Sequence, residues 1–187
     1  MKQSTEAGDK NRLFCSKPLN RLDKAKRLFF GHIGALALGA HAAFSPPPAS
    51  AEDIIGRASV IDGDTIEIHG TRIRLFAIDA VESSQSCTTF TGQRWPCGRN
   101  SALALADLIG SRPVACEPLD RDRYGRIVAR CFSADQDIAA WSVANGWAQA
   151  WARYSTEYLH LQAQAESLGL GIWSGTFEDP QSARKKN

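Results

Sequence analysis

The chain has 187 residues, of which 43% are hydrophobic and 22% are charged, a composition typical of a soluble globular domain. Residues 1–51 hold eight Lys and Arg against three Asp and Glu, whereas residues 52–187 hold fourteen against seventeen, a net charge of about −3. This balance argues against binding of nucleic acid by bulk positive charge, because such binding depends on Lys and Arg neutralising phosphates. Any nucleic-acid function must come from a local site.

Residues 1–51 have the pattern of an export signal. A basic stretch ends at Lys24–Arg27, an apolar run follows at Leu28–Phe44, and the small residues Ala49–Ala51 predict cleavage before Glu52. We therefore expect a bacterial protein that is periplasmic or secreted. The alternative is an uncleaved membrane anchor, although the apolar run is at the short edge of what spans a bilayer.

The domain that follows is expected over residues 52–176, with a basic, flexible tail at residues 177–187. Its first part contains short β-branched runs that predict strands at 58–61, 65–69 and 72–78. These strands would form a three-stranded meander.

A polar stretch leads to a predicted helix, which has Asn100 as its N-cap and ends at Gly110. Pro113–Glu117 and Ile127–Phe132 predict a hairpin, and helices are predicted over about 137–145 and 156–168. Five short strands with interspersed helices fit an α+β fold, a five-stranded OB-fold β-barrel with about three helices, although periodicity alone does not separate it from other α+β folds. We interpret Trp141, Trp147, Trp151 and Trp173 as packing residues of this fold, and the alternative is that they are base-stacking platforms.

Cysteine usage agrees with export. Cys15 would leave with the signal, and the remaining four cysteines form an even set suited to two disulfides. Cys116 and Cys131 are equidistant from a polar turn and would face each other across the predicted hairpin, which leaves Cys87 with Cys97. A Cys₄ zinc site is the competing interpretation, but the sequence lacks a Cys-x-x-Cys spacing and a nearby pair of histidines.

Three clusters of polar residues carry the chemistry: Asp62-Gly63-Asp64, the segment from Arg74 to Glu82, and Asp122-Arg123-Tyr124-Gly125-Arg126. Taken alone, the first and the third are ordinary turns. The second is more informative, because an apolar strand ends there in two carboxylates, Asp79 and Glu82, at the start of a loop. Arg74 and Asp79 would lie roughly 17 Å apart on a straight strand, so strong coiling is required to bring them together.

Together the clusters supply oxygen ligands for a divalent cation, a carboxylate to activate water and guanidiniums to hold phosphate, which are the requirements of phosphodiester hydrolysis. In their order and separations they resemble the signature of the staphylococcal nuclease family. The resemblance covers nearly all of residues 56–174, including Gly-Ile-Trp-Ser at 171–174. It implies an OB-fold barrel with three helices that binds one Ca²⁺ and cuts DNA and RNA to leave 3′-phosphate ends.

The resemblance also implies a metal site. Asp64 and Asp79 would be side-chain ligands of Ca²⁺, and the backbone carbonyl of Ala80 and waters would complete the oxygen shell. Asp62 would support the turn. The ligands by themselves would also accept Mg²⁺ or Mn²⁺.

The catalytic groups implied by the resemblance are Glu82, as general base on the attacking water, and Arg74 and Arg126, which would grip the phosphate. Arg123 and Tyr124 would contact the substrate beside the scissile phosphate.

The chain departs from the family's reference member in two ways. Ala80 and Val81 stand where that member has Thr and Pro, and the second change could alter the loop that aims Glu82. Lysines are scarce after residue 51, so we expect weaker and more salt-sensitive capture of substrate.

The expected partners are DNA and RNA, with the protein a monomer that has no stable protein partner and that touches a membrane only if the signal stays uncleaved. Two alternatives remain open at the level of sequence. One is a binding module of the same fold that has lost catalysis, and the other is an envelope protein that assists production of surface polysaccharide.

Overall fold

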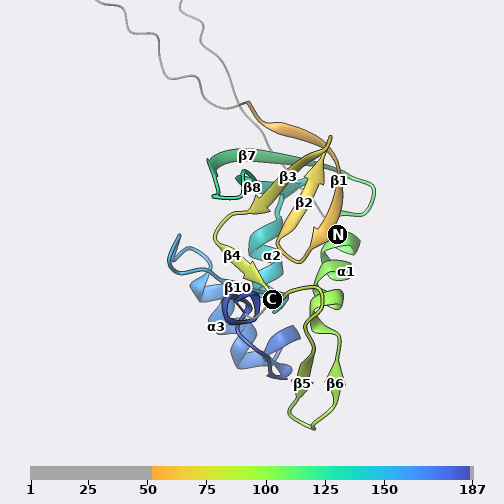
Figure 1. Ribbon diagram of the computed structural model, residues 1–187, viewed down its shortest axis with the longest axis vertical. Helices are drawn as coiled ribbons and strands as arrows, with labels where there is room; N and C mark the ends of the chain where they lie inside the picture. Colours follow the sequence, from red (N-terminus) through yellow and green to blue (C-terminus); the bar gives the residue numbers. More distant parts are fainter. Residues whose placement is uncertain (1–51, 186–187) are drawn as a thin grey trace, which may run out of the picture. The chain divides into compact units, whose positions relative to one another are not determined.

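The computed structural model describes residues 52–185 (Figure 1). The predicted export signal, at residues 1–51, lies outside the described residues. Within the described part, no helix combines the length and the apolar character that crossing a membrane requires.

Five strands form a closed barrel: β1 (Ile54–Asp62), β2 (Thr65–Ile68), β3 (Thr71–Leu75), β7 (Pro113–Arg121) and β8 (Ile127–Ser133). Neighbours in the order β3-β2-β1-β7-β8 pair antiparallel, and a parallel pairing between β3 and β8 closes the barrel. The closure confirms the predicted five-stranded OB-fold barrel.

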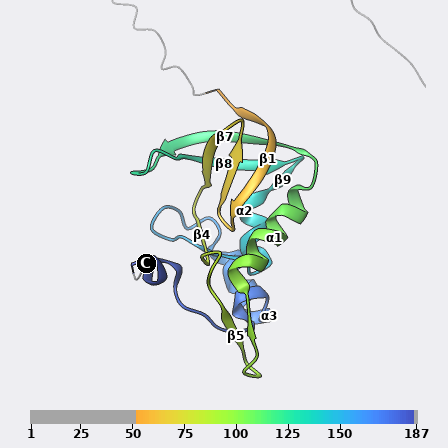
Figure 2. The same ribbon diagram turned by 45° about the vertical axis from the view of Figure 1, so that its right-hand side comes forward.

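The other elements lie outside the barrel. Short strands are β4 (Ile78–Ala80), β5 (Cys87–Thr89), β6 (Arg94–Trp95), β9 (Gln136–Asp137), β10 (Ala148–Ala150) and β11 (Gly175–Thr176). Helices are α1 (Cys97–Ile109), α2 (Ile138–Ala144), α3 (Leu159–Leu168), α4 (Pro180–Arg184) and the 3₁₀ helix η1 (Gly171–Ser174). In Figure 2, α1 runs beside the barrel, and the β5–β6 hairpin extends away from the barrel beyond it.

One hydrophobic core joins the barrel to the helices. Ile66 and Ile73 are paired across β2 and β3, and both are fully buried. In α1, Ser101, Leu105 and Ile109 are buried at four-residue spacing, so one face of this helix packs inward. The paired isoleucines of β2 and β3 and the buried face of α1 therefore pack in the same interior.

The prediction of one continuous strand over residues 72–78 is wrong, because the structure has two strands there. The first ends at Leu75 and a new strand begins at Ile78, because Ala77 between them adopts a left-handed conformation with φ +58°. The backbone amide of Phe76 donates to Ala129, whereas the carbonyl of Ala77 accepts from Trp151. The turn redirects the chain from the barrel to β10, so strong coiling of one strand is not needed.

The predicted helix at Asn100 begins earlier than expected. Asn100 lies inside α1, which starts at Cys97, and its amide donates to the carbonyl of Pro96. The disulfide between Cys87 and Cys97 places this first turn beside the β5–β6 hairpin, a hairpin that the polar stretch did not reveal.

The third helix also differs from its predicted range, because α3 begins at Leu159 and not at residue 156. The two residues before it are engaged elsewhere. Glu157 receives hydrogen bonds from Arg130, and the hydroxyl of Tyr158 donates to Asp137 at 2.8 Å. This polar network ties the start of α3 to the barrel.

The tail was expected to be flexible, but its described part is ordered as α4. Asp179 caps the helix by accepting from the amide of Ser182 at 3.0 Å, and Pro180 occupies its first turn. Pro180 and Ala183 are buried. Burial of two side chains and an N-terminal cap therefore stabilise α4, although the basic composition of this segment predicted a solvated tail.

Both predicted disulfides are present. Cys116 and Cys131 lie directly opposite each other on β7 and β8, and Cys87 is bonded to Cys97 at the base of the β5–β6 hairpin. Both bridges join residues that are close in sequence, so each reinforces a local unit.

Replacing Cys116 and Cys131 together by Ala should lower the free energy of unfolding by about 3 kcal/mol, the stabilisation expected from closing a loop of this length. Urea unfolding followed by tryptophan fluorescence under non-reducing conditions measures the change. The matched control replaces Cys87 and Cys97, whose shorter loop predicts a smaller loss. An unchanged midpoint in the first variant would contradict the expectation.

Candidate active site

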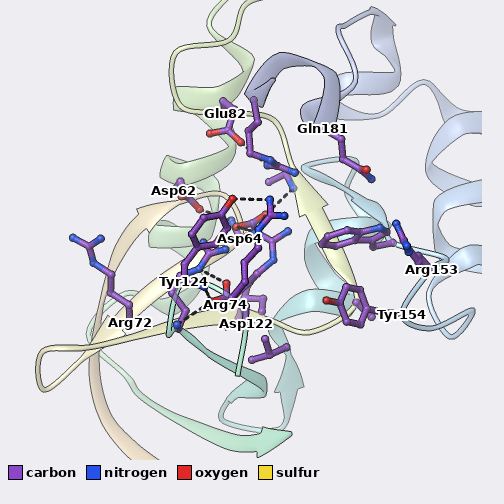
Figure 3. A pocket seen from close by; sticks show the side chains of 18 of the residues that line it. Asp62, Asp64, Arg72, Arg74, Glu82, Asp122, Tyr124, Arg153, Tyr154 and Gln181 are labelled. Atoms are coloured by element: carbon purple, nitrogen blue, oxygen red, sulfur yellow. Dashed lines mark hydrogen bonds and ion pairs between the residues drawn. The ribbon is translucent and has the colours of Figure 1, made fainter. Parts of the chain in front are cut away.

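The three polar clusters meet in one cleft of about 1030 Å³ at the side of the barrel (Figure 3). The clusters come from the β1–β2 turn, from β3 to the loop after β4, and from the β7–β8 turn. The predicted site residues that line the cleft are Asp62, Asp64, Arg74, Ala80, Glu82, Arg123, Tyr124 and Arg126. Asp79 contacts the lining through Arg74.

Arg74 joins the two predicted metal ligands. Its guanidinium lies 3.0 Å from Asp64 and 2.8 Å from Asp79, and both carboxylates are only 3% exposed. The turn at Ala77 is what allows Arg74 and Asp79 to meet. One buried cation is thus shared between two buried anions.

Burial decides the electrostatics of this group. It raises the pKa of Asp64 and of Asp79, and the nearby guanidiniums only partly offset the effect. Arg74 itself is held charged, because the two carboxylates raise its pKa more than burial lowers it. Positive charge close to the pair therefore stabilises its ionised form.

Asp64 is placed by the tight turn between β1 and β2. The carboxylate of Asp62 accepts from the amide of Asp64 at 3.0 Å. A Cβ on Gly63 would lie 2.3 Å from the hydroxyl of Ser101 and 2.7 Å from Cβ of Ala80, so only glycine fits there. The glycine reflects close packing against α1 and β4 as well as the need for a turn.

Glu82 is carried by a loop with apolar and polar anchors. Val81 is buried beside the Cys87–Cys97 disulfide, and the side chain of Gln85 accepts from the amide of Glu82. A Cβ on Gly98 would lie 1.7 Å from the carbonyl oxygen of Glu82. Burial of Val81 and contact with α1 thus fix a loop that lacks the proline of the family's reference member.

Arg126 is oriented by Asp122 within the β7–β8 turn. Its Nε donates to Asp122 at 2.7 Å, and Nη1 donates to the hydroxyl of Thr65 at 3.2 Å. Burial disfavours the Asp122 carboxylate, but hydrogen bonds from Arg126 and from the turn amides keep its pKa below the usual value. Asp122 is therefore an ionised partner that points Arg126 into the cleft.

Tyr124 and Arg123 form the outer wall of the same turn. Tyr124 is 70% exposed, with the guanidiniums of Arg123 and Arg126 located 4.8 Å and 5.7 Å from its ring. Gly125 has φ +81° and makes the turn possible, as the sequence predicted. The wall offers an aromatic face and two cations to a ligand.

The donor chemistry of the cleft fits a hard divalent cation. Asp64 and Asp79 supply carboxylate oxygens close to the backbone of Ala80, whose amide donates to Asp64 at 3.2 Å. Within residues 52–185, no three His, Cys, Asp or Glu side chains are grouped so as to hold a metal. Backbone carbonyl and water would have to complete the shell, which Ca²⁺ and Mg²⁺ both accept.

Positive charge is concentrated in the cleft. Of the thirteen Lys and Arg in the described residues 52–185, seven line it, against four acidic residues. The seven are Arg72, Arg74, Arg123, Arg126, Arg153, Arg184 and Lys185. An acidic domain can thereby present a local site for a polyanion.

Several lining residues were missed by the sequence analysis. Trp151, interpreted there as a packing residue, stacks under Arg74 at 5.2 Å and contacts Tyr154 edge to face. Figure 3 shows Arg153 and Tyr154 on one side of the cleft, with Gln181 of α4 and Glu82 at another. The aromatic and basic residues after β10 belong to no motif that would predict a site. No feature of the sequence near α4 predicts that this helix lines the cleft.

Comparison with known proteins assigns the chain to a protein family. The model of the staphylococcal nuclease homologue family matches residues 72–175, which is more than half of the chain. The chain belongs to the staphylococcal nuclease family. Its matched segment contains β3, the Glu82 loop and the β7–β8 turn, so the family signature coincides with most of the cleft.

Individual relatives extend this picture. The chain is 43% identical over 170 residues to the succinoglycan biosynthesis protein ExoI of Rhizobium meliloti, covering 88% of this chain and 85% of that protein. It is 33% identical over 135 residues to an uncharacterized endonuclease of Escherichia coli, with 68% and 82% covered. A probable staphylococcal-like nuclease of rice, CAN3, is 31% identical over 117 residues, with 61% and 28% covered. The family model and the two relatives named as nucleases support a hydrolase of the nuclease class.

Replacing Asp122 by Asn should lower turnover of nucleic acid by about tenfold or more, because Arg126 loses the ionised partner that orients it. The values of kcat and KM on DNA measure the effect, with a thermal melt to verify folding. Asp120→Asn, two residues earlier on the surface of β7, is the matched control. Equal kcat in the two variants would show that Asp122 does not position Arg126.

Proposed function

We propose that this family member is an exported, calcium-dependent nuclease that hydrolyses phosphodiester bonds of DNA and RNA and leaves 3′-phosphate ends. The observation that carries the proposal is the convergence of Asp64, Arg74, Asp79, Glu82 and Arg126 at one cleft. These groups come from three separate parts of the chain, and each has a task in hydrolysis of a phosphodiester.

The guanidiniums would bind the scissile phosphate. Arg74 and Arg126 approach the cleft from different elements, and both are held by carboxylates that orient their planar forks. As negative charge builds up on the phosphoryl oxygens in the transition state, fixed positive charges stabilise it without reorganising. The same residues thus serve both capture and catalysis.

Glu82 would act as the general base. It accepts a proton from the attacking water while the water oxygen forms a bond to phosphorus and the bond to the 5′ oxygen breaks. The leaving 5′ oxygen takes a proton from solvent. The anchored loop around Glu82, held by Val81 and Gln85, supports this assignment because a base must be held within reach of the proton that it removes.

Asp64, Asp79 and the carbonyl of Ala80 would hold Ca²⁺. When bound, the ion supplies positive charge beside the phosphate and favours deprotonation of the nearby water. Burial of the two carboxylates supports this assignment, because it leaves them in need of positive charge. The exposed ring of Tyr124 and the side chain of Arg123 would contact the substrate beyond the scissile bond.

Export is supported by the signal-like pattern of residues 1–51 and by two disulfides, which persist in oxidising compartments. A periplasmic or secreted location, action as a monomer and cleavage of the signal before Glu52 belong to the same proposal.

The alternative is a protein of the envelope that binds a polyanion without cutting it. The name of the relative from Rhizobium meliloti, a succinoglycan biosynthesis protein, favours a role of this kind in production of surface polysaccharide. The site favours catalysis, because a binding module would need neither a buried carboxylate pair nor an anchored Glu82. Both versions share the basic cleft, so cleavage is the discriminating property.

The deciding experiment is digestion of plasmid DNA and of RNA by the purified protein with Ca²⁺, with Mg²⁺ and with a calcium chelator. We expect cleavage of both polymers in Ca²⁺, loss of cleavage with the chelator and ends that carry 3′-phosphate. Arg126→Ala should abolish the activity, whereas the distant surface variant Arg112→Ala should keep it. Folded protein that binds nucleic acid and never cuts would overturn the proposal in favour of the binding module.

Replacing Glu82 by Gln should reduce kcat by several orders of magnitude while binding of Ca²⁺ and of substrate persists, since the change removes proton transfer and little else. Single-turnover rates together with equilibrium binding of an oligonucleotide separate the two effects. Near-normal turnover in this variant would exclude Glu82 as the base.

A further inference from the structure

The C-terminal helix α4 reaches back into the cleft. It is anchored by the buried side chains of Pro180 and Ala183 and by a hydrogen bond from Gln85 to the carbonyl of Glu178 at 2.9 Å. Gln85 also holds the amide of Glu82. The segment that carries α4 is therefore tied to the loop that carries the proposed base, and Figure 3 shows Gln181 at the same side of the cleft as Glu82.

Arg184, in the last turn of α4, binds the carboxylates at the centre of the site. Its Nη2 donates to both oxygens of Asp79, at 2.6 Å and 2.7 Å, and its Nη1 donates to Glu82. One guanidinium thus donates hydrogen bonds both to a proposed metal ligand, Asp79, and to the proposed general base, Glu82. The Arg184 side chain is only 35% exposed, so these contacts are partly shielded from solvent.

A divalent cation could not share this position. Arg184 takes both oxygens of Asp79, and a metal held by the same carboxylate at 2.3–2.6 Å would lie against the guanidinium with like charge. Arg74 differs, because it contacts one oxygen of Asp79 and is buried beneath the pair. The displaceable cation is therefore Arg184, which sits at the end of a short helix.

We infer that Arg184 is an internal cation that competes with the divalent metal for Asp79, so that α4 closes the site in the metal-free protein and is released when metal binds. This inference rests on the proposed function of the cleft. While α4 is closed, Glu82 is paired and cannot accept a proton from water. Binding of metal would free Asp79 and Glu82 in one step. Because only open molecules bind metal, the apparent affinity is the intrinsic affinity multiplied by the fraction of molecules that are open.

The test is a calorimetric titration of Ca²⁺ into the full-chain protein, its Arg184→Gln variant and the matched Lys185→Gln variant. The last removes the same charge one residue further on, at a position that also lines the cleft. Arg184→Gln should bind Ca²⁺ about tenfold more tightly than the wild type, and Lys185→Gln should stay within about twofold of it. Asp79→Asn should lose the binding, which identifies the titrated site.

Hydrogen exchange gives a second readout that does not depend on turnover. Addition of Ca²⁺ to the wild type should speed exchange of the amides of α4, and the effect should be absent in Asp79→Asn. Equal Ca²⁺ affinity of wild type and Arg184→Gln, or weaker binding by the variant, would overturn the inference and leave the proposed nuclease intact. No Ca²⁺ binding by either protein would overturn the inference and remove calcium from the proposed function as well.

Discussion

Arg74 lies between Asp64 and Asp79 and donates to both, and the rest of the site depends on this contact. Two carboxylates buried side by side repel each other and lose their hydration, and the guanidinium that they share partly offsets both effects. Removing one partner of such a buried pair commonly costs about 3–5 kcal/mol, because a charge is left unpaired. The barrel, the turn at Ala77 and the tight turn at Gly63 are the structural means that bring these three groups together.

The buried carboxylates of Asp64 and Asp79 are only partly compensated by positive charge, and this links the structure of the site to its function. Burial raises the pKa of both carboxyl groups, and the guanidiniums of Arg74 and, at Asp79, of Arg184 offset this only in part, so positive charge stabilises the ionised pair. The protein offers two candidates for that role. One is a divalent metal, on which the proposed nuclease activity depends, and the other is Arg184, whose guanidinium already holds Asp79. Competition between them would couple the state of α4 to the metal.

The charge distribution reconciles an acidic domain with a polyanionic substrate. Seven of the thirteen lysines and arginines in residues 52–185 line one cleft, so positive charge is concentrated there although the net charge of residues 52–187 is negative. The family comparisons agree with a nuclease, while one relative is named a succinoglycan biosynthesis protein. A cleft of this kind suits polyanions in general, and the anchored Glu82 is what adds hydrolysis to binding.

Local features of the sequence predicted the strands, both disulfide pairs and the three clusters that line the cleft, and the family resemblance added the barrel to them. Periodicity, turn chemistry and the spacing of Cys116 and Cys131 act over short stretches of chain, so they can be read without knowing the fold. Other features were decided by the tertiary structure alone. The break at Ala77 follows from hydrogen bonds to Ala129 and Trp151, and the early start of α1 follows from the bridge at Cys97.

The return of α4 is the clearest case, because Arg184 meets Asp79 across 105 residues of sequence. Nothing in the basic end of the chain indicated a partner, since the attraction comes from carboxylates whose burial exists only after the barrel has closed. Sequence alone therefore determined which chemical groups the protein carries and the elements that present them. The tertiary structure decided which charges are deprived of water, and with that which residues must pair.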